Sequence, residues 1–196
     1  VLGHLPPSLG DSALRQLQDL GVEVLLNTRV KSMHPRQVEF EDGRVLRAAN
    51  LIWAAGVSAT PLTRQLGVEL DRAGRVKVHP DLSLPGHPEV FAVGDMALVV
   101  DDQGRPVPGV SPAAMQMARH VARVLREDLE GPAPAPSERA PFKYWDKGTM
   151  ATIGRSAAVA KIGALELSGF PAWLAWLLVH LLFLIGFRNK VAVLLQ

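Results

Sequence analysis

The sequence predicts an α/β fold that ends in an apolar helical tail, and three observations carry this prediction. Helical and strand-like spacings of apolar residues alternate along residues 1–169. Two short apolar runs, 51–55 and 90–93, each end at a glycine, which is typical of strands buried on both faces of a sheet. Residues 170–187 are apolar almost throughout, with His180 as the one strongly polar side chain.

The composition excludes several classes of protein. The chain has 196 residues and a formal charge of +2, from 21 Lys and Arg against 19 Asp and Glu. A charge so close to zero argues against a nucleic-acid partner. The absence of cysteine excludes disulfides, thiolate zinc sites and redox-active cysteine pairs in this chain. His4, His34, His79 and His87 show no metal-ligand spacing, so no metal site is predicted.

Residues 1–30 have the pattern of a helix followed by a strand. Asp11 and Ser12 offer a helix N-cap, leucines follow at helical spacing, and Gly21 is placed to end the helix. A strand is predicted over 22–26, where apolar and polar residues alternate.

Glycine turns predict two hairpins. Asp42-Gly43 favours a tight turn between the strands 37–40 and 44–46. Gly74 is predicted to turn a second, shorter hairpin, whose strands are 68–70 and 76–78.

A long helix is predicted over 112–129, after a surface loop at 101–111. Pro112 suits the first turn, because the N–H that proline lacks would not be used there. The predicted apolar stripe consists of Ala114, Met117, Ala118, Val121, Val124 and Leu125. This arrangement places His120 on the solvent-facing side.

The region after this helix is predicted to contain a connector and further strands. The prolines of 131–141 predict a stiff, extended segment. Strands are then predicted over 142–145, 149–153 and 157–162.

The apolar tail indicates membrane contact. At roughly 1.5 Å per residue, residues 170–187 would form a helix about 27 Å long, just short of a typical bilayer span. Trp173 and Trp176 at one end and cationic residues at 188–190 suit the two headgroup boundaries. Because glycine, proline and His180 interrupt the segment, a helix lying on the membrane surface is favoured over one that spans it. A helix buried inside the protein is the alternative.

Gly94-Asp95 is the clearest candidate for a ligand site. A buried strand would deliver both residues to its carboxyl end, where ligands bind in α/β sheets. Glycine allows close approach of the backbone, and aspartate can accept hydrogen bonds from a sugar or ribityl hydroxyl. The alternative is a strand followed by an ordinary Asx turn.

Three stretches together resemble one enzyme family. Gly94-Asp95 followed by the helix near Pro112 resembles the carboxyl-terminal flavin motif of flavoproteins with two dinucleotide-binding domains. Residues 52–57, Ile-Trp-Ala-Ala-Gly-Val, resemble the strand that ends their NAD domain. Residues 143–154, which include Asp-Lys-Gly-Thr, resemble together with the apolar tail the interface region of type II NADH dehydrogenases, the single-subunit NADH:quinone oxidoreductases. This resemblance extends over essentially the whole chain.

The resemblance implies that the chain is the carboxyl-terminal part of a Rossmann-like flavoprotein. The family carries one G-x-G-x-x-G turn for FAD and one for NADH, and neither is present here. The chain also begins at Val1 without a methionine, as expected of a piece of a longer protein. The implied organisation is the end of the NAD-binding domain at 1–57, the returning part of the FAD-binding domain at 58–130, a proline-rich linker at 131–141, and interface strands with the membrane tail at 142–196.

The resemblance also implies roles for single residues. Asp95 would bind the ribityl or diphosphate part of FAD, with Gly94 allowing the approach. Ala114, Met115 and Gln116 would lie against the isoalloxazine ring, and Lys147 would reach the flavin edge beside the quinone. Gln116 and Lys147 are thus the implied catalytic residues. The alternatives are an ordinary polar residue at a helix start and a solvated turn lysine.

One position departs from the family pattern. Gln116 would match the second glutamine of the quinone motif Ala-Gln-x-x-x-Gln, but the first two positions are Ser111 and Pro112 here. A proline has no side-chain amide with which to contact quinone.

The function implied by the resemblance is FAD-dependent electron transfer from NADH to a membrane quinone, without proton pumping and with no activity in this piece alone. Residues 170–190 would attach the protein to the cytoplasmic face of the cell membrane as a peripheral, monotopic protein that can form a homodimer. The alternatives are another two-domain FAD/NAD(P) oxidoreductase, such as a ferredoxin reductase-like enzyme, and a non-catalytic membrane-tethered module.

Overall fold

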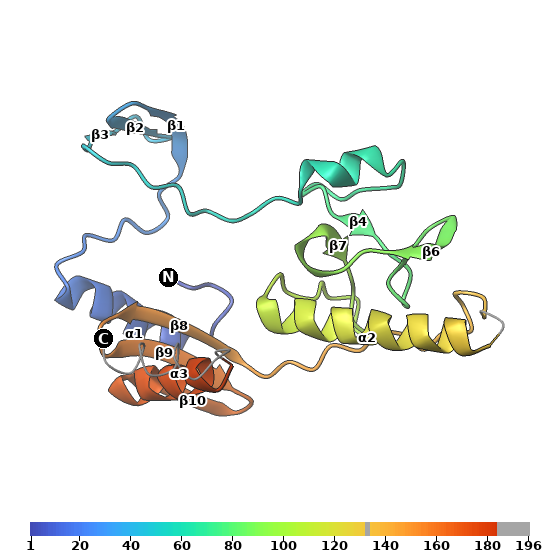
Figure 1. The fold of residues 1–196 in the computed structure, drawn as a ribbon. Helices are drawn as coiled ribbons and strands as arrows, with labels where there is room; N and C mark the ends of the chain where they lie inside the picture. Colours follow the sequence, from blue (N-terminus) through green and yellow to red (C-terminus); the bar gives the residue numbers. More distant parts are fainter. Residues whose placement is uncertain (132–133, 184–196) are drawn as a thin grey trace. The chain divides into compact units, whose positions relative to one another are not determined.

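The computed structural model describes residues 1–131 and 134–183, and the chain divides into two compact units (Figure 1). Unit 1 consists of Val1–Ile52 and Lys147–Gln196, and unit 2 consists of Trp53–Asp146. Each unit has a hydrophobic core of its own. Helices and strands occur in both units, which confirms the predicted α/β class.

The centre of unit 1 is a three-stranded antiparallel sheet with a helix on each face (Figure 1). The strands are β8 (Thr149–Gly154), β9 (Ala157–Ile162) and β10 (Leu165–Gly169), and the helices are α1 (Pro7–Asp19) and α3 (Phe170–Phe183). Side chains of the central strand point alternately to the two faces. Val159 therefore packs with Leu9 of α1, whereas Ala158 and Ala160 pack with Ala172 of α3.

A second antiparallel sheet of unit 1 contains the predicted Asp-Gly hairpin. Its strands are β1 (Val30–His34), β2 (Gln37–Phe40) and β3 (Val45–Arg47). At the turn between β2 and β3, Gly43 has a φ of +84°, and the backbone N–H of Arg44 donates to Asp42 Oδ1 at 3.0 Å. The hairpin prediction is confirmed.

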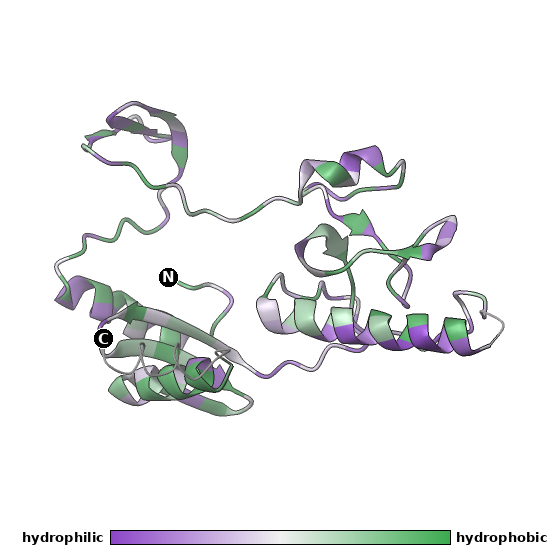
Figure 2. Cartoon of the chain, viewed as in Figure 1, coloured by the Kyte–Doolittle hydropathy of each residue, from purple (hydrophilic) through white to green (hydrophobic). Residues whose placement is uncertain are grey.

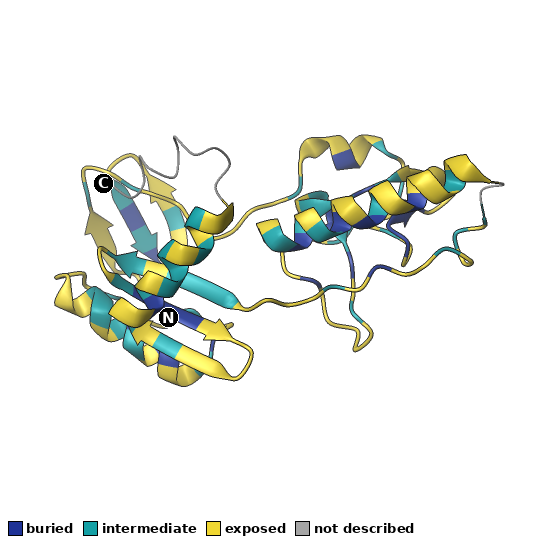
Figure 3. Ribbon diagram, turned by 60° about the horizontal axis from the view of Figure 1, so that its bottom comes forward, coloured by how far each residue is buried: buried dark blue, intermediate teal, exposed yellow. Residues whose placement is uncertain are grey.

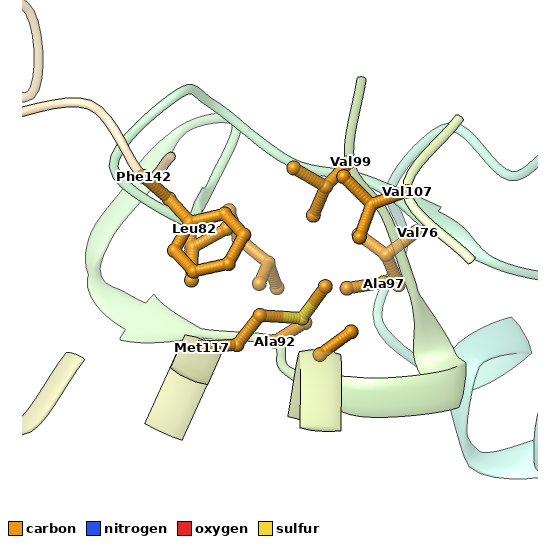
Figure 4. Close-up of a cluster of buried hydrophobic side chains, with 10 residues drawn as sticks. Val76, Leu82, Ala92, Ala97, Val99, Val107, Met117 and Phe142 are labelled. Atoms are coloured by element: carbon orange, nitrogen blue, oxygen red, sulfur yellow. The ribbon is translucent and has the colours of Figure 1, made fainter. Parts of the chain in front are cut away.

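Unit 2 is built from short strands and one long helix around a single apolar cluster (Figure 4). Its elements are η1 (Pro61–Gln65), β4 (Val76–Lys77), β5 (Ser83–Leu84), β6 (His87–Phe91), η2 (Gly94–Met96), β7 (Ala97–Leu98) and α2 (Ser111–Glu130). β4 and β7 are parallel, whereas β5 and β6 are antiparallel. Met117 of α2 and Phe142 of the following segment reach the cluster around Leu82. The hairpin predicted around Gly74 is present as the bridge Leu70–Val76.

The predicted long helix is confirmed, but its buried face only partly matches the predicted stripe, of which Met117 and Val124 are buried. Its buried residues are Ala113, Met117, His120 and Val124, whereas Ala118 and Leu125 of the predicted stripe are exposed (Figure 3). His120 was expected on the outer side and is only 6% exposed. The edge of its ring meets Phe142, which enters the core from the connector, so the helix is turned toward a neighbour that helical spacing alone does not reveal.

The strands predicted at 22–26, 51–55 and 142–145 are wrong. Ile52 and Trp53 are 90% and 62% exposed, although the run that contains them reads as a buried strand. A strand needs a neighbouring strand, and none of the described strands or isolated bridges includes these three segments. The apolar run at 90–93 is a strand only to Phe91, and there it is antiparallel and largely exposed.

Two details at the ends of unit 1 also differ from the predictions. α1 begins at Pro7, not after Asp11 and Ser12. Proline suits this first position because its fixed φ is already helical and the N–H that it lacks would have no partner in the first turn. Gly21 ends the helix as predicted, with a φ of +79°. β10 was not predicted, and it continues the sheet beyond the confirmed strands β8 and β9.

The apolar tail begins as α3, a helix of 14 residues that is mostly hydrophobic (Figure 2). Within residues 1–131 and 134–183, no helix is both long and apolar enough to cross a membrane. The rest of the predicted tail, 184–187, and the cationic residues 188–190 lie outside the described residues.

Candidate functional site

Gly94 and Asp95 line a small pocket of unit 2 with a volume of about 100 Å³. Gly94 has a φ of +68°, a conformation that side chains disfavour, and a Cβ there would lie 3.4 Å from the Cβ of Ala114. Its N–H points to Met117 Sδ at 3.2 Å. The glycine thus lets the chain turn directly against the first turns of α2, and its role in the approach of a ligand stays a prediction.

Asp95 is an exposed residue of this pocket lining. Its side chain is exposed, and its carboxylate accepts no hydrogen bond from any residue in the described part of the chain. A Cβ on Gly109 would lie only 3.3 Å from Asp95 Oδ1, so a glycine at 109 leaves room for the carboxylate. The arrangement provides a hydrogen-bond acceptor for hydroxyl donors of a ligand.

Arg75, which the sequence analysis did not single out, also lines the pocket. Asp71 holds it, because Arg75 Nε donates to Asp71 Oδ2 at 2.8 Å and the Arg75 backbone N–H donates to Oδ1 at 2.8 Å. Burial opposes ionisation of Asp71, but these hydrogen bonds keep the pKa of its carboxyl below the ordinary value. The repeated pattern Asp-x-x-Gly-Arg, at 71–75 and again at 101–105, is the sequence signal that could have identified this turn.

The three neighbouring residues predicted against a flavin ring point in different directions on α2. Ala114 faces Gly94, Met115 is exposed, and Gln116 contacts the segment before Lys147. Consecutive side chains on a helix diverge by about 100°, so one planar group would not contact all three equally. The structure brings Ala114 into contact with the pocket residue Gly94, whereas Met115 makes no such contact.

Gln116 forms a reciprocal pair of hydrogen bonds with the backbone of Trp145. Gln116 Nε2 donates to the Trp145 carbonyl oxygen at 3.0 Å, and the Trp145 N–H donates to Gln116 Oε1 at 2.9 Å. The side-chain amide therefore fixes the path of the chain two residues before Lys147. One amide N–H and one lone pair of the glutamine remain for a ligand.

Lys147 belongs to unit 1, at the start of the segment that leads into β8. Its Nζ lies 5.9 Å from the centre of the Phe183 ring at the end of α3, within the range of a cation–π contact. The next residue, Gly148, has a φ of +103°, and a Cβ there would collide with the carbonyl oxygen of Lys161 in β9. The Asp-Lys-Gly-Thr stretch thus needs its glycine for close packing of two backbones.

A buried ion cluster fixes the chain that follows α2. Arg139 donates to Asp81 Oδ2 at 3.0 Å, to Asp128 Oδ2 at 2.6 Å and to the Pro88 carbonyl at 2.7 Å. The Arg139 and Asp81 side chains are 5% and 0% exposed. Burial opposes ionisation of Asp81, but hydrogen bonds from Ser83 and Arg139 outweigh it and hold the pKa of Asp81 below its ordinary value. No sequence motif indicated this cluster, whose members are far apart in the chain.

His120 is neutral in its position between α2 and the connector. Its Nδ1 is 3.0 Å from an Arg123 guanidinium nitrogen, which can only donate, so Nδ1 accepts. Burial lowers the pKa of His120, and the charge of Arg123 lowers it further. The charges of Asp81 and Glu127 oppose this effect, and the pKa nevertheless stays below the ordinary value.

The described ranges, 1–131 and 134–183, contain no group of three or more His, Asp or Glu side chains arranged to hold a metal ion. The sequence prediction of no metal site concerns the whole chain and stays a prediction.

The comparisons identify the kind of protein that shares this sequence. A family model described as pyridine nucleotide-disulphide oxidoreductase matches residues 1–118. Two proteins of Mycobacterium tuberculosis named type II NADH:quinone oxidoreductase, Ndh and NdhA, are 50% and 44% identical over 100% and 99% of this chain. A Haemophilus influenzae protein of the same name is 32% identical over 83% of the chain. The resemblance drawn from the sequence is thereby confirmed.

The fold also matches solved structures. The structure of NDH2 from Plasmodium falciparum in complex with NADH has a TM-score of 0.81 with this chain, at 16% identity, and the match covers 97% of this chain and 54% of that one. The chain spans 42% of the length of the two mycobacterial proteins. The predicted roles of Gly94, Asp95, Ala114, Met115, Gln116 and Lys147 are not tested by these matches and stay predictions.

Proposed function

Because this chain belongs to the pyridine nucleotide-disulphide oxidoreductase family, we propose that the whole protein that carries it is a type II NADH:quinone oxidoreductase. In this reaction NADH gives up a hydride, and the quinone takes up two electrons and two protons: NADH + H⁺ + Q gives NAD⁺ + QH₂. The 50% identity to a protein of that name, over the whole chain, carries the proposal. The carboxylate at the Gly94-Asp95 pocket supports it.

The residues around this pocket fit a part of FAD. Gly94 and Gly109 leave space at the backbone, and the Asp95 carboxylate offers an acceptor for hydroxyl groups. The volume of about 100 Å³ is below the roughly 300 Å³ that is usual for a small-molecule site, so the pocket suits a section of a dinucleotide and not the whole of it. When bound, FAD would store two electrons between oxidation of NADH and reduction of quinone.

Residues of this chain would then orient the reacting groups. The amino-terminal end of α2, beside Gly94, favours negative charge because the helix dipole is positive there. Gln116 would hold the backbone of Trp145 and so fix the start of the segment that carries Lys147. The Lys147 ammonium can donate a proton or a hydrogen bond to an oxygen that gains negative charge.

We further propose that α3 attaches the protein to the cytoplasmic face of the cell membrane as a peripheral, monotopic helix. One side of α3 packs on the β8–β10 sheet through Ala172 and Trp173. Its other side exposes large apolar residues: Phe170, Leu174, Leu178, Leu182 and Phe183. A helix covered by protein on one side and apolar on the other suits burial at the headgroup boundary. Assembly of the whole protein into a homodimer is part of the same proposal.

An anaerobic absorption spectrum of the purified whole protein tests the activity. We expect flavin bands that bleach when NADH is added and return when a short-chain quinone follows. Bleaching without recovery would keep the family chemistry and overturn the quinone as acceptor, whereas a protein without flavin bands would overturn the proposal. Asp95→Ala should lower the flavin content, and the matched variant Asp102→Ala, on an exposed loop, should not.

Sedimentation with lipid vesicles tests the membrane contact. The double variant Leu174→Glu/Leu178→Glu places two charges on the exposed side of α3, so we expect it to stay in the supernatant while the unchanged protein sediments. Leu129→Glu is the control, since Leu129 is an exposed leucine of α2. Equal sedimentation of all three proteins would contradict the proposed role of α3.

A further inference from the structure

A second groove of unit 2, with a volume of about 380 Å³, shares none of its lining residues with the Gly94-Asp95 pocket. One wall belongs to α2 and the other to the segment 141–143. The lining residues are Gln116, Arg119, His120, Arg123, Pro141, Phe142 and Lys143. The four α2 residues follow the spacing i, i+3, i+4, i+7, so they lie on one face of the helix.

The charges along this groove are all positive. Arg119 and Arg123 come from one wall and Lys143 from the other, and no carboxylate belongs to the lining. Asp102 Oδ2 lies 3.9 Å from Lys143 Nζ, where both side chains are largely exposed. Within the part of the chain that the structure describes, neither arginine forms an ion pair, in contrast to Arg75 and Arg105, each held by an aspartate of its own turn.

The guanidinium of Arg123 is held in place. One of its five N–H donors goes to Nδ1 of His120, whose buried ring is itself packed against Phe142. His120 can accept this bond only while neutral, so the histidine orients the arginine without adding charge. Arg123 makes no other hydrogen bond to the described residues, and its planar fork is left with donors for an anion.

We propose that this groove binds a phosphate group. Two guanidinium forks on one wall suit paired hydrogen bonds to phosphate oxygens, and a lysine on the facing wall adds a point charge. The groove has room for a phosphomonoester or a phosphodiester together with the group that it carries. The phosphate belongs to a soluble phosphate ester or to the headgroup of an anionic lipid. The proposal is independent of NADH oxidation, so its failure would leave the proposed function unaffected.

Binding of inorganic phosphate to the whole protein, measured by calorimetric titration at low ionic strength, tests the proposal. Arg123→Gln should weaken binding about tenfold or more, because it removes a charged two-pronged contact. The matched control is Arg126→Gln, which removes the same charge from an exposed position of α2 outside the groove. Lys143→Gln, on the facing wall, is a second variant whose side chain is exposed enough to be replaced without disturbing the core.

The outcomes separate clearly. Weaker binding in Arg123→Gln and Lys143→Gln, with Arg126→Gln unchanged, supports the site. No binding of phosphate, or an equal effect of all three substitutions, overturns it. Sedimentation with vesicles of phosphatidylcholine, with and without phosphatidylglycerol, identifies the source of the phosphate. Extra sedimentation that requires both phosphatidylglycerol and Arg123 assigns the lipid headgroup. If the protein binds inorganic phosphate but shows no such extra sedimentation, the ligand is a soluble phosphate ester. The Leu174→Glu/Leu178→Glu background removes the contribution of α3 from this comparison.

Discussion

Gln116 and Trp145 are 29 residues apart in the sequence and exchange two hydrogen bonds, at 3.0 and 2.9 Å. The side-chain amide takes the place that a neighbouring strand would occupy, because it offers one donor and one acceptor to a single backbone residue. The segment 142–145 was predicted as a strand and has no strand partner among the described residues. The glutamine supplies the hydrogen bonds that such a partner would have given.

Replacing Gln116 should loosen this segment. Gln116→Leu removes both hydrogen bonds, and we expect a loss of about 1 kcal/mol in the free energy of unfolding, since the bonds are partly exposed. Chemical unfolding of the whole protein measures this loss. Gln103→Leu, at an exposed loop position whose side chain makes no hydrogen bond to the described residues, serves as the control. Identical stability of the two variants would show that the pair does not hold the segment.

Gly148→Ala should destabilise the protein far more than Gly163→Ala. Both glycines have a positive φ, so both substitutions carry a backbone cost of roughly 1 kcal/mol. Only at 148 would the new Cβ also collide with backbone, at the Lys161 carbonyl and 3.0 Å from Ile162 Cα. Gly163, in the turn between β9 and β10, has open space around it. Thermal unfolding of both variants tests the prediction, and similar melting temperatures would contradict it.

Arg139→Met should lower stability by about 3 kcal/mol, because it leaves Asp81 buried without its cation. Arg119→Met, an exposed arginine without an ion pair in the described residues, should cost little. Because the pKa of Asp81 is lowered on folding, its ionised form stabilises the protein above the ordinary value of 3.8, and this contribution is lost as the pH falls through the lower folded-state pKa. In Arg139→Met the loss should begin at a higher pH. An unchanged acid unfolding midpoint would refute this account.

His120 should make the protein less stable in mild acid. Its folded-state pKa is lowered from 6.5 by burial and by Arg123, so the unfolded chain binds a proton near this pH that the folded protein does not. The contribution of neutral His120 to the free energy of unfolding is therefore fully present above pH 6.5, and it is lost as the pH falls from 6.5 through the lower folded-state pKa. Urea unfolding at pH 5.5 and 7.5 should show this difference, and His120→Asn should reduce it. His79→Asn, at an exposed histidine, should leave the difference unchanged.

Local features of the fold were predictable because short-range signals specify them. Asp42-Gly43 turns a hairpin since few residues adopt its dihedral angles, and the helix at 111–130 follows from its proline start and apolar spacing. The Gly94-Asp95 pair, singled out from its residue types, lines a pocket, and its predicted role in binding a ligand stays a prediction. Errors arose at 22–26 and 51–55, where apolar patterns read as strands but no described neighbour pairs with them.

The sequence by itself determined the turns, the long helix, the apolar tail and the family, because each depends on residue type and spacing along the chain. Only the tertiary structure decided which face of α2 is buried, that His120 orients Arg123, and that Arg139 joins Asp81 to Asp128. These relationships join residues whose proximity depends on how helices, turns and connector pack together. A charged or polar side chain occupies the same kind of sequence pattern whether it is exposed to solvent or buried. Its neighbours in space determine whether it is solvated or buried in a hydrogen-bond network.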